Sequence, residues 1–210
     1  MEWFLTGIIV TTFFILGASR LAPCIRIAAV QGAMLSVLPI LARGSVTDPH
    51  SLGMFFGTFL IKAILIPILL FRSLRQSKIR EEMEPTVSRH LSLLAGGLVV
   101  VLSFSWQLPN LPGSHSPLIV PTALAMVLLG FLLLVTRRKA VTQVIGFLVL
   151  ENGVFLFGMT LATEFPITVE MGVLLDLLVG VFVMGIMINH INRTFDHIDT
   201  TLLASLRETE

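Results

Sequence analysis

Long apolar runs follow one another along almost the whole chain and leave few folds open to it. Seven of them have the ~17–25 residues that a helix needs to cross a bilayer core, at 3–19, 27–43, 52–72, 91–107, 117–136, 142–163 and 168–190. Hydrophobic residues make up 55% of the 210 residues and the mean hydropathy is +0.92, beyond what a soluble domain tolerates. Because lipid offers no partner to backbone groups, the runs predict an all-α, polytopic membrane protein.

Basic residues predict the orientation of these helices. The Lys and Arg residues of the connections gather after the first, third, fifth and seventh runs, at Arg20, Arg26, Arg72, Arg75, Lys78, Arg80, Arg89, Arg137, Arg138, Lys139, Arg193 and Arg207. The connections on the other side contain only Arg43. Cytoplasmic connections carry the excess of Lys and Arg, so the N-terminus is predicted outside and the C-terminus inside. Since no basic residue precedes the first run, we expect an uncleaved helix there rather than a signal peptide.

The two ends of the chain share an order of features that indicates a repeat. In each, a helix ending in arginine is followed by a helix with an amide-glycine pair, Gln31-Gly32 or Asn152-Gly153, and by a helix with a central charge, Lys62 or Asp176. A fourth helix between the sets gives both the same orientation, a 3+1+3 parallel repeat of a kind seen in transporters. We therefore divide the chain into a first repeat, a linker containing the fourth helix, a second repeat and a cytoplasmic tail, at 1–80, 81–115, 116–193 and 194–210.

Three ionisable residues lie near the centres of apolar runs, where bulk water cannot solvate a charge. They are Lys62, Glu151 and Asp176. An acid in the bilayer pairs with a cation, takes a proton or lines a wet cavity, and each state couples it to protons. We therefore expect these three residues to form a proton relay. Pro67 supports the choice of Lys62, because its missing N–H leaves the Ala63 carbonyl without a helical partner and predicts a kink beside the lysine.

Polar neighbours of these residues include two amides and a histidine. Gln31 and Asn152 lie within apolar runs, and His190 lies at the inner interface, where it is either a supporting polar residue or an ordinary boundary histidine. A plainer interpretation also stands for the two acids. Glu151 and Asp176 would then only hydrogen-bond across helices, as polar residues in membranes commonly do.

The sequence lacks the motifs of catalysis and of cofactor binding. It has a single cysteine, Cys24, and no Cys or His cluster with the spacing of a zinc, haem or iron–sulfur site. A nucleophile elbow and a phosphate-binding loop are absent as well. The net charge of +1 gives no indication of nucleic-acid binding. We expect a non-catalytic chain with no cofactor or metal of its own, whose partners are lipid and other membrane subunits.

Several stretches of the second half form a pattern known from a protein family. They are the run Leu129 to Arg138, Ile145-Gly146 leading to Glu151, Asp176 with Gly180 four residues later, and Asn189-His190 before Arg193. In these residues the chain from Leu128 onward resembles the three-helix K subunit of bacterial respiratory complex I and the C subunit of multisubunit cation/proton antiporters. Over its whole length it is similar to hydrogenase-4 component E, a membrane subunit of group 4 nickel–iron hydrogenases and formate hydrogenlyase-type complexes.

The resemblance implies roles for the two acids. In the K subunit two intramembrane glutamates belong to a central polar axis along which protons move, and Glu151 matches the first and Asp176 the second. Aspartate is shorter by one methylene, so Asp176 departs from the pattern in geometry but keeps the charge. The resemblance further implies a non-catalytic subunit of a hydrogenase or complex I-like oxidoreductase in the prokaryotic cytoplasmic (inner) membrane, beside antiporter-like subunits. Nickel–iron and iron–sulfur centres would belong to partner subunits, and the transported ion would be a proton or sodium.

Two other functions fit the same sequence. A stand-alone transporter would share the 3+1+3 plan but would need a substrate cavity and would work without partners. A purely structural spacer would hold neighbouring subunits together through helix packing, and would tolerate Glu151→Gln and Asp176→Asn with assembly and pumping intact. The sequence leaves these alternatives open.

Overall fold

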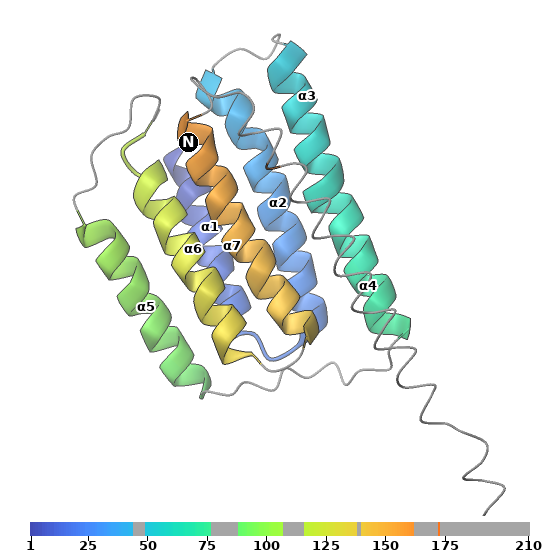
Figure 1. The fold of residues 1–210 in the computed structure, drawn as a ribbon, viewed down its shortest axis with the longest axis vertical. Helices are drawn as coiled ribbons and strands as arrows, with labels where there is room; N and C mark the ends of the chain where they lie inside the picture. Colours follow the sequence, from blue (N-terminus) through green and yellow to red (C-terminus); the bar gives the residue numbers. More distant parts are fainter. Residues whose placement is uncertain (44–48, 77–87, 107–115, 138–139, 162–171, 173–210) are drawn as a thin grey trace, which may run out of the picture.

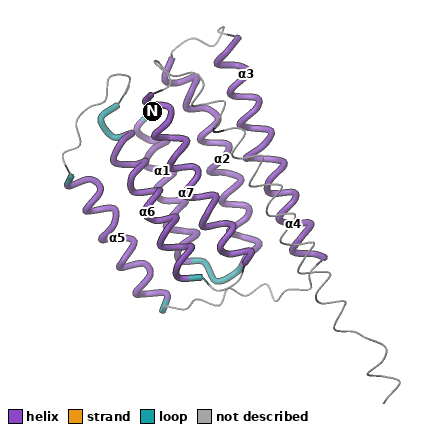
Figure 2. Tube along the Cα trace, viewed as in Figure 1, coloured by secondary structure: helices purple, strands orange, loops and turns teal. Residues whose placement is uncertain are grey.

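The computed structural model describes residues 1–43, 49–76, 88–106, 116–137, 140–161 and 172, and this part of the chain is a bundle of helices (Figure 1). The helices are α1 (Glu2–Gly17), α2 (Leu21–Arg43), α3 (Pro49–Thr58), η1 (Phe59–Leu65), α4 (Ile66–Gln76), α5 (Arg89–Ser105), α6 (Ile119–Thr136) and α7 (Ala140–Leu161). No strand occurs among the described residues (Figure 2). The predicted all-α fold is confirmed for this part.

Four stretches are long and apolar enough to cross a membrane: Leu21–Leu41, Phe55–Arg72, Ile119–Thr136 and Thr142–Thr160. The shorter helices α1 and α5 are also apolar. Apart from Gly172, the expected segment at 168–190, with Asp176 and His190, lies outside the described residues, as does the tail at 194–210. The seven spans, the repeat and the orientation remain predictions.

The largest difference from the expected boundaries is at the start of α2, which begins at Leu21 rather than at residue 27. Pro23 is the third residue of the helix, where a backbone N–H would have no helical acceptor, so proline breaks no hydrogen bond there. The Arg26 side chain is exposed, which lets its charge remain solvated. The helix therefore includes polar residues that the apolar run alone excluded.

The third expected segment is one continuous rod of α3, η1 and α4, and its middle is a π-helix. At the end of η1 the Ile66 N–H donates to the Ile61 carbonyl, five residues back. Pro67 follows directly, so the disturbance predicted beside it takes the form of a change in helix type over Phe59–Leu65. Such π-helical turns are frequent at functional sites, and this one contains Lys62.

Helix α2 has a central place in the bundle. It packs against α1 and α7 on one side and against α3, η1 and α4 on the other (Figure 1). Helices α6 and α7 pack closely along their length, and α5 lies outermost, against α1 and α6. The short connections after α1 and α6 bring the end of α1, the start of α2, the end of α6 and the start of α7 to the same end of the bundle. Arg20 directly precedes α2, Arg72 lies in the second half of α4, Arg89 is the first residue of α5, and Arg137 directly follows α6. We call the end of the bundle where these helix termini lie the basic end.

Two apolar clusters fill the interior, one above and one below a polar layer. The first, toward the basic end, includes Leu16, Ile25, Leu70, Leu133 and Val149. The second includes Leu5, Leu38, Ala123, Met126 and Leu156. The buried polar residues Thr12, Gln31, Glu151 and Asn152 lie between the two clusters in sequence on α1, α2 and α7, and Lys62 of η1 joins them through its hydrogen bond to Asn152. The helices thus place a polar layer about halfway along the bundle.

Two glycines allow the helices that carry this layer to approach closely. A Cβ on Gly32 of α2 would lie 2.8 Å from the Lys62 Cβ and 2.9 Å from the Lys62 carbonyl carbon. A Cβ on Gly153 of α7 would lie 2.7 Å from the backbone nitrogen of Val127 on α6. Both distances are too short for a real side chain, so the small residue beside each amide sets the spacing of the helix backbones.

Arg137 closes the basic end of the bundle. It directly follows α6, is 3% exposed, and its Nη2 donates to the Leu16 carbonyl in the last turn of α1. Helix C-termini carry partial negative charge, so the ends of α1 and α6 both stabilise the guanidinium. Burial lowers the pKa of Arg137 from its usual value, but an arginine side chain remains charged in a protein. The residue therefore joins two helix ends through a charged hydrogen bond.

Candidate functional site

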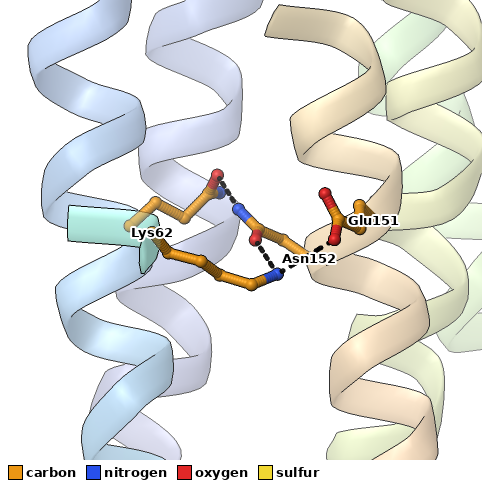
Figure 3. A network of polar contacts seen from close by, with 4 residues as sticks. Lys62, Glu151 and Asn152 are labelled. Atoms are coloured by element: carbon orange, nitrogen blue, oxygen red, sulfur yellow. Dashed lines mark hydrogen bonds and ion pairs between the residues drawn. The ribbon is translucent and has the colours of Figure 1, made fainter. Parts of the chain in front are cut away.

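Lys62 projects from η1 toward α7, and its side chain is 4% exposed (Figure 3). Its Nζ donates to Oδ1 of Asn152 at 3.0 Å, lies 3.8 Å from Oε1 of Glu151, and sits 5.0 Å from the ring centroid of Phe155. All three partners are on α7, with Glu151 and Asn152 adjacent and Phe155 about one turn further along. A hydrogen bond, an ion pair and an aromatic face together replace water around the ammonium group.

Glu151 is buried with a less complete set of partners. Its side chain is 3% exposed, and neither carboxylate oxygen has a hydrogen-bond partner among the described residues. The 3.8 Å separation from Lys62 exceeds the usual length of a direct hydrogen bond, so the two charges attract without sharing a proton in this geometry. A carboxylate held this way keeps its capacity to accept a proton.

The polar contacts continue from Asn152 across α2 to α1. Asn152 Nδ2 donates to Oε1 of Gln31 at 3.1 Å, and Gln31 Nε2 donates to Oγ1 of Thr12 at 2.8 Å and to the Ile8 carbonyl at 3.2 Å. Thr12 Oγ1 in turn donates to the Ile8 carbonyl at 2.9 Å. A connected set of side chains therefore joins η1, α7, α2 and α1, and its first steps are drawn in Figure 3.

Lys62 sets the donor-to-acceptor direction of these hydrogen bonds. An ammonium group only donates, so Asn152 must accept with its oxygen, which leaves its NH₂ group to donate to Gln31. Gln31 then accepts with its own oxygen and donates to α1. Hydrogen bonds aligned in this way polarise one another and stabilise the positive charge at the start of the chain.

Among the described side chains of this site, only Lys62 and Glu151 are groups that titrate. Side-chain amides hydrogen-bond but do not ionise, whereas carboxylates and amines gain and lose protons. Within the described residues of this layer, Glu151 and Lys62 are the groups that can exchange a proton. No set of three or more His, Cys, Asp or Glu residues that could hold a metal occurs in the part of the chain that the structure describes.

Four of the residues expected from the sequence lie together in this site: Gln31, Lys62, Glu151 and Asn152. The role of Lys62 and Glu151 in a proton relay, with Gln31 and Asn152 as supporting polar residues, remains a prediction. Asp176 and His190 lie outside the described residues. Thr12 and Phe155 were not predicted. A threonine in a spanning helix can bond the carbonyl four residues back, and a phenylalanine is ordinary there, so neither gives a sequence signal.

Comparison with known proteins places the chain in a family. It is 31% identical over 158 residues to hydrogenase-4 component E of Escherichia coli K12, covering 72% of this chain and 71% of the relative. The chain belongs to the hydrogenase-4 component E family. The component E of Shigella flexneri matches over the same 158 residues with the same identity.

Another relative aligns with nearly the whole length of this component E family member. It is the uncharacterized protein Rv0085 of Mycobacterium tuberculosis, 30% identical over 205 residues, which is 96% of this chain and 93% of the relative. No protein-family model and no solved structure matches the chain. Family membership and the apolar helices identify a membrane protein, and the likeness to the complex I K subunit and the antiporter C subunit remains a prediction.

Proposed function

We propose that this chain is a non-catalytic membrane subunit of a hydrogenase-like oxidoreductase complex, and that its buried Lys62–Glu151 pair takes part in coupled ion translocation. The name of the Escherichia coli relative supports the assignment to such a complex. The observation that carries the second part is the pair itself, which lies 3.8 Å apart with side chains 4% and 3% exposed. Ionisable groups inside a membrane are costly, and they usually mark a route for ions or protons.

The pair has a simple proton chemistry. As ammonium and carboxylate it has no net charge, and transfer of one proton from Nζ to Oε1 gives a neutral amine and a carboxylic acid without changing the total. A proton that arrives from outside the pair protonates Glu151 and leaves the site positive, which a buried site resists. A partner that lowers or raises the local potential would therefore load or unload the pair.

The neighbouring amides hold this pair in place. Asn152 fixes the ammonium at 3.0 Å, and Gln31 fixes the orientation of Asn152. Because neither amide ionises, the chain toward α1 stabilises the charge on Lys62 and does not carry protons onward. The route for protons therefore does not run from Lys62 and Glu151 through Asn152 and Gln31 to α1.

The K-subunit resemblance supplies the wider setting of the proposal. Asp176 is the second acid of the relay, and His190 supports it near the inner interface. The seven helices form a 3+1+3 parallel repeat with the N-terminus outside, in the prokaryotic inner membrane. Antiporter-like membrane subunits are the neighbours, and the redox centres belong to partner subunits.

The energy for transport comes from the parent complex. Moving one elementary charge against the membrane potential requires about 2.3 kcal/mol per 100 mV. In this proposal the redox centres belong to partner subunits, and the pair acts when a partner drives it. The transported ion is a proton, or sodium if the carboxylate exchanges its proton for that ion.

The test is redox-driven ion translocation by the assembled complex in sealed vesicles at matched subunit content. Glu151→Gln and Asp176→Asn are compared with Glu2→Gln, which alters an exposed acid at the start of α1. We expect translocation to fall at least tenfold in the first two variants and to remain unchanged in the third. Unchanged translocation in Glu151→Gln with the complex intact would contradict the relay and leave a structural spacer. Solute uptake by membranes containing only this chain would instead favour a stand-alone transporter.

A further inference from the structure

A small cavity lies against Lys62, one member of the buried pair. Lys62 and Asn152 form its polar wall, and apolar residues of α2, α4 and α7 form the rest. The space open to the centre of a water molecule is about 10 Å³, which is roughly the volume that one water needs. A water there has an ammonium group and an amide as partners, and two polar partners are enough to hold it.

The cavity extends from the polar layer toward the basic end of the bundle. Its lining includes Ile25, Leu70 and Leu148, from α2, α4 and α7. Ile25 lies four residues after the start of α2, which is about 6 Å along a helix axis. Leu148 lies eight residues after the start of α7, or about 12 Å. The cavity thus occupies the side of Lys62 that faces the arginine-rich helix ends.

The geometry points to a water-binding site that connects Lys62 with the solution at the basic end. The role in proton access rests on the proposed function of the pair. A water at this site accepts a hydrogen bond from Lys62, and a proton moves when the ammonium N–H bond breaks as a new O–H bond forms on the water. In the same step that water gives one of its own protons to a solvent water entering from the basic end, so charge and atoms balance and no hydronium is left in the apolar cavity. Because the side-chain amides of Asn152 and Gln31 do not carry protons toward α1, the cavity is the route by which protons leave Lys62.

The hydration of the cavity is tested with the full chain in membrane vesicles, using Ag⁺ as a cation of about the size of water. In a Cys24→Ala background, Leu148→Cys places a thiol on the lining, and Val154→Cys places one on the outward face of the same helix, where Val154 is 45% exposed. Ag⁺ replaces the thiol proton to form a silver thiolate, and the thiol left free is counted with maleimide after denaturation. We expect Leu148→Cys to be blocked at least tenfold faster than Val154→Cys.

Equal or slower blocking of the Leu148→Cys thiol would overturn the water site. A second pair keeps the test decisive if Leu148→Cys does not fold. Ile66 lines the cavity, so Ile66→Cys places a thiol there. Ile68 on the same helix is 57% exposed, so Ile68→Cys places a thiol on the outward face. The same tenfold difference in blocking is expected between them.

The proton-access role is tested by filling the cavity. Ala28 lines it and is 7% exposed, whereas Val30 on the same helix is 54% exposed, so Ala28→Leu fills the space and Val30→Leu is the matched control. We expect Ala28→Leu to slow Ag⁺ blocking of Leu148→Cys and to lower redox-driven translocation at least fivefold, with no effect of Val30→Leu.

Parallel measurement of Glu151→Gln separates the two possible failures. Loss of translocation in Glu151→Gln together with normal translocation in Ala28→Leu would reject the cavity as the route and keep the proposed function. Normal translocation in Glu151→Gln would reject the function and with it the access role. The Ag⁺ blocking rates still decide in that case whether the cavity holds water.

Discussion

The side-chain amide of Asn152 on α7 donates a hydrogen bond of 3.1 Å to the side-chain carbonyl of Gln31 on α2, although the two residues are 121 positions apart. The same amide accepts from Lys62 at 3.0 Å, so one side chain joins three helical segments. The two amides are also the residues that align when the halves of the sequence are compared as repeats. The repeat itself remains a prediction.

Removal of Lys62 leaves the Glu151 carboxylate buried without its cation. We expect Lys62→Met to lower the free energy of unfolding by about 3–5 kcal/mol, the usual cost of breaking a buried ion pair from one side. The double variant Lys62→Met with Glu151→Gln removes both charges and should recover more than half of that loss. A double-mutant cycle measured by unfolding in mixed detergent checks the coupling. Additive losses in the two single variants would show that the pair does not interact.

Gln31→Leu interrupts the polar chain between α7 and α1. The substitution leaves the Asn152 NH₂ group and the Thr12 hydroxyl with one partner fewer, and interhelical hydrogen bonds in membranes contribute about 0.6–1.7 kcal/mol. We expect a loss of about 1–2 kcal/mol in the free energy of unfolding and a partial loss of translocation. Gln143→Leu is the comparison, because Gln143 is exposed and its Nε2 donates to the Arg137 carbonyl near the start of α7. A larger loss for Gln143→Leu would contradict the importance of the buried chain.

Gly32→Ala tests the close approach of α2 and η1. The new Cβ would meet the Lys62 Cβ at 2.8 Å, so the helices must separate, at a cost of about 1–3 kcal/mol for an overpacked contact. The separation moves Lys62 relative to Glu151, and translocation should fall with the stability. Gly97→Ala on α5 is the control, because nothing lies within 4 Å of a Cβ there. Alanine favours a helix over glycine by about 1 kcal/mol, so we expect Gly97→Ala to be neutral or stabilising.

Arg137→Ala removes the charged hydrogen bond between the ends of α1 and α6. A hydrogen bond to a charged group contributes about 1.5–3 kcal/mol, and the free energy of unfolding should fall by that amount. Arg137→Lys keeps the charge beside the two helix ends and should recover part of the loss. Arg26→Ala, which alters an exposed arginine, should have little effect. Equal losses in Arg137→Ala and Arg26→Ala would show that the contact with Leu16 contributes nothing.

The helical character of the chain was predictable because it depends on local composition. Apolar runs at the length of a bilayer crossing predicted the segments that became α1, α2, the α3–η1–α4 rod, α5, α6 and α7. The boundary of α2 was wrong by six residues, since an apolar window excludes Arg26 and Pro23 although a helix accepts both at its start. The π-helix around Lys62 could not be predicted from the sequence, because Pro67 indicates a disturbed helix without fixing the type of disturbance.

The residues of the candidate site were predictable from the sequence, but their contacts were not. Sequence by itself determined that Lys62, Glu151, Gln31 and Asn152 are polar groups in apolar surroundings, because the cost of burying a charge depends on the residue type and its neighbours in the run. Only the tertiary structure decided that Lys62 contacts Asn152 and Glu151, that Gln31 donates to Thr12, and that a cavity adjoins Lys62 and Asn152. Those contacts depend on how four helices rotate and how closely their backbones approach, and both are set by packing between segments distant in sequence.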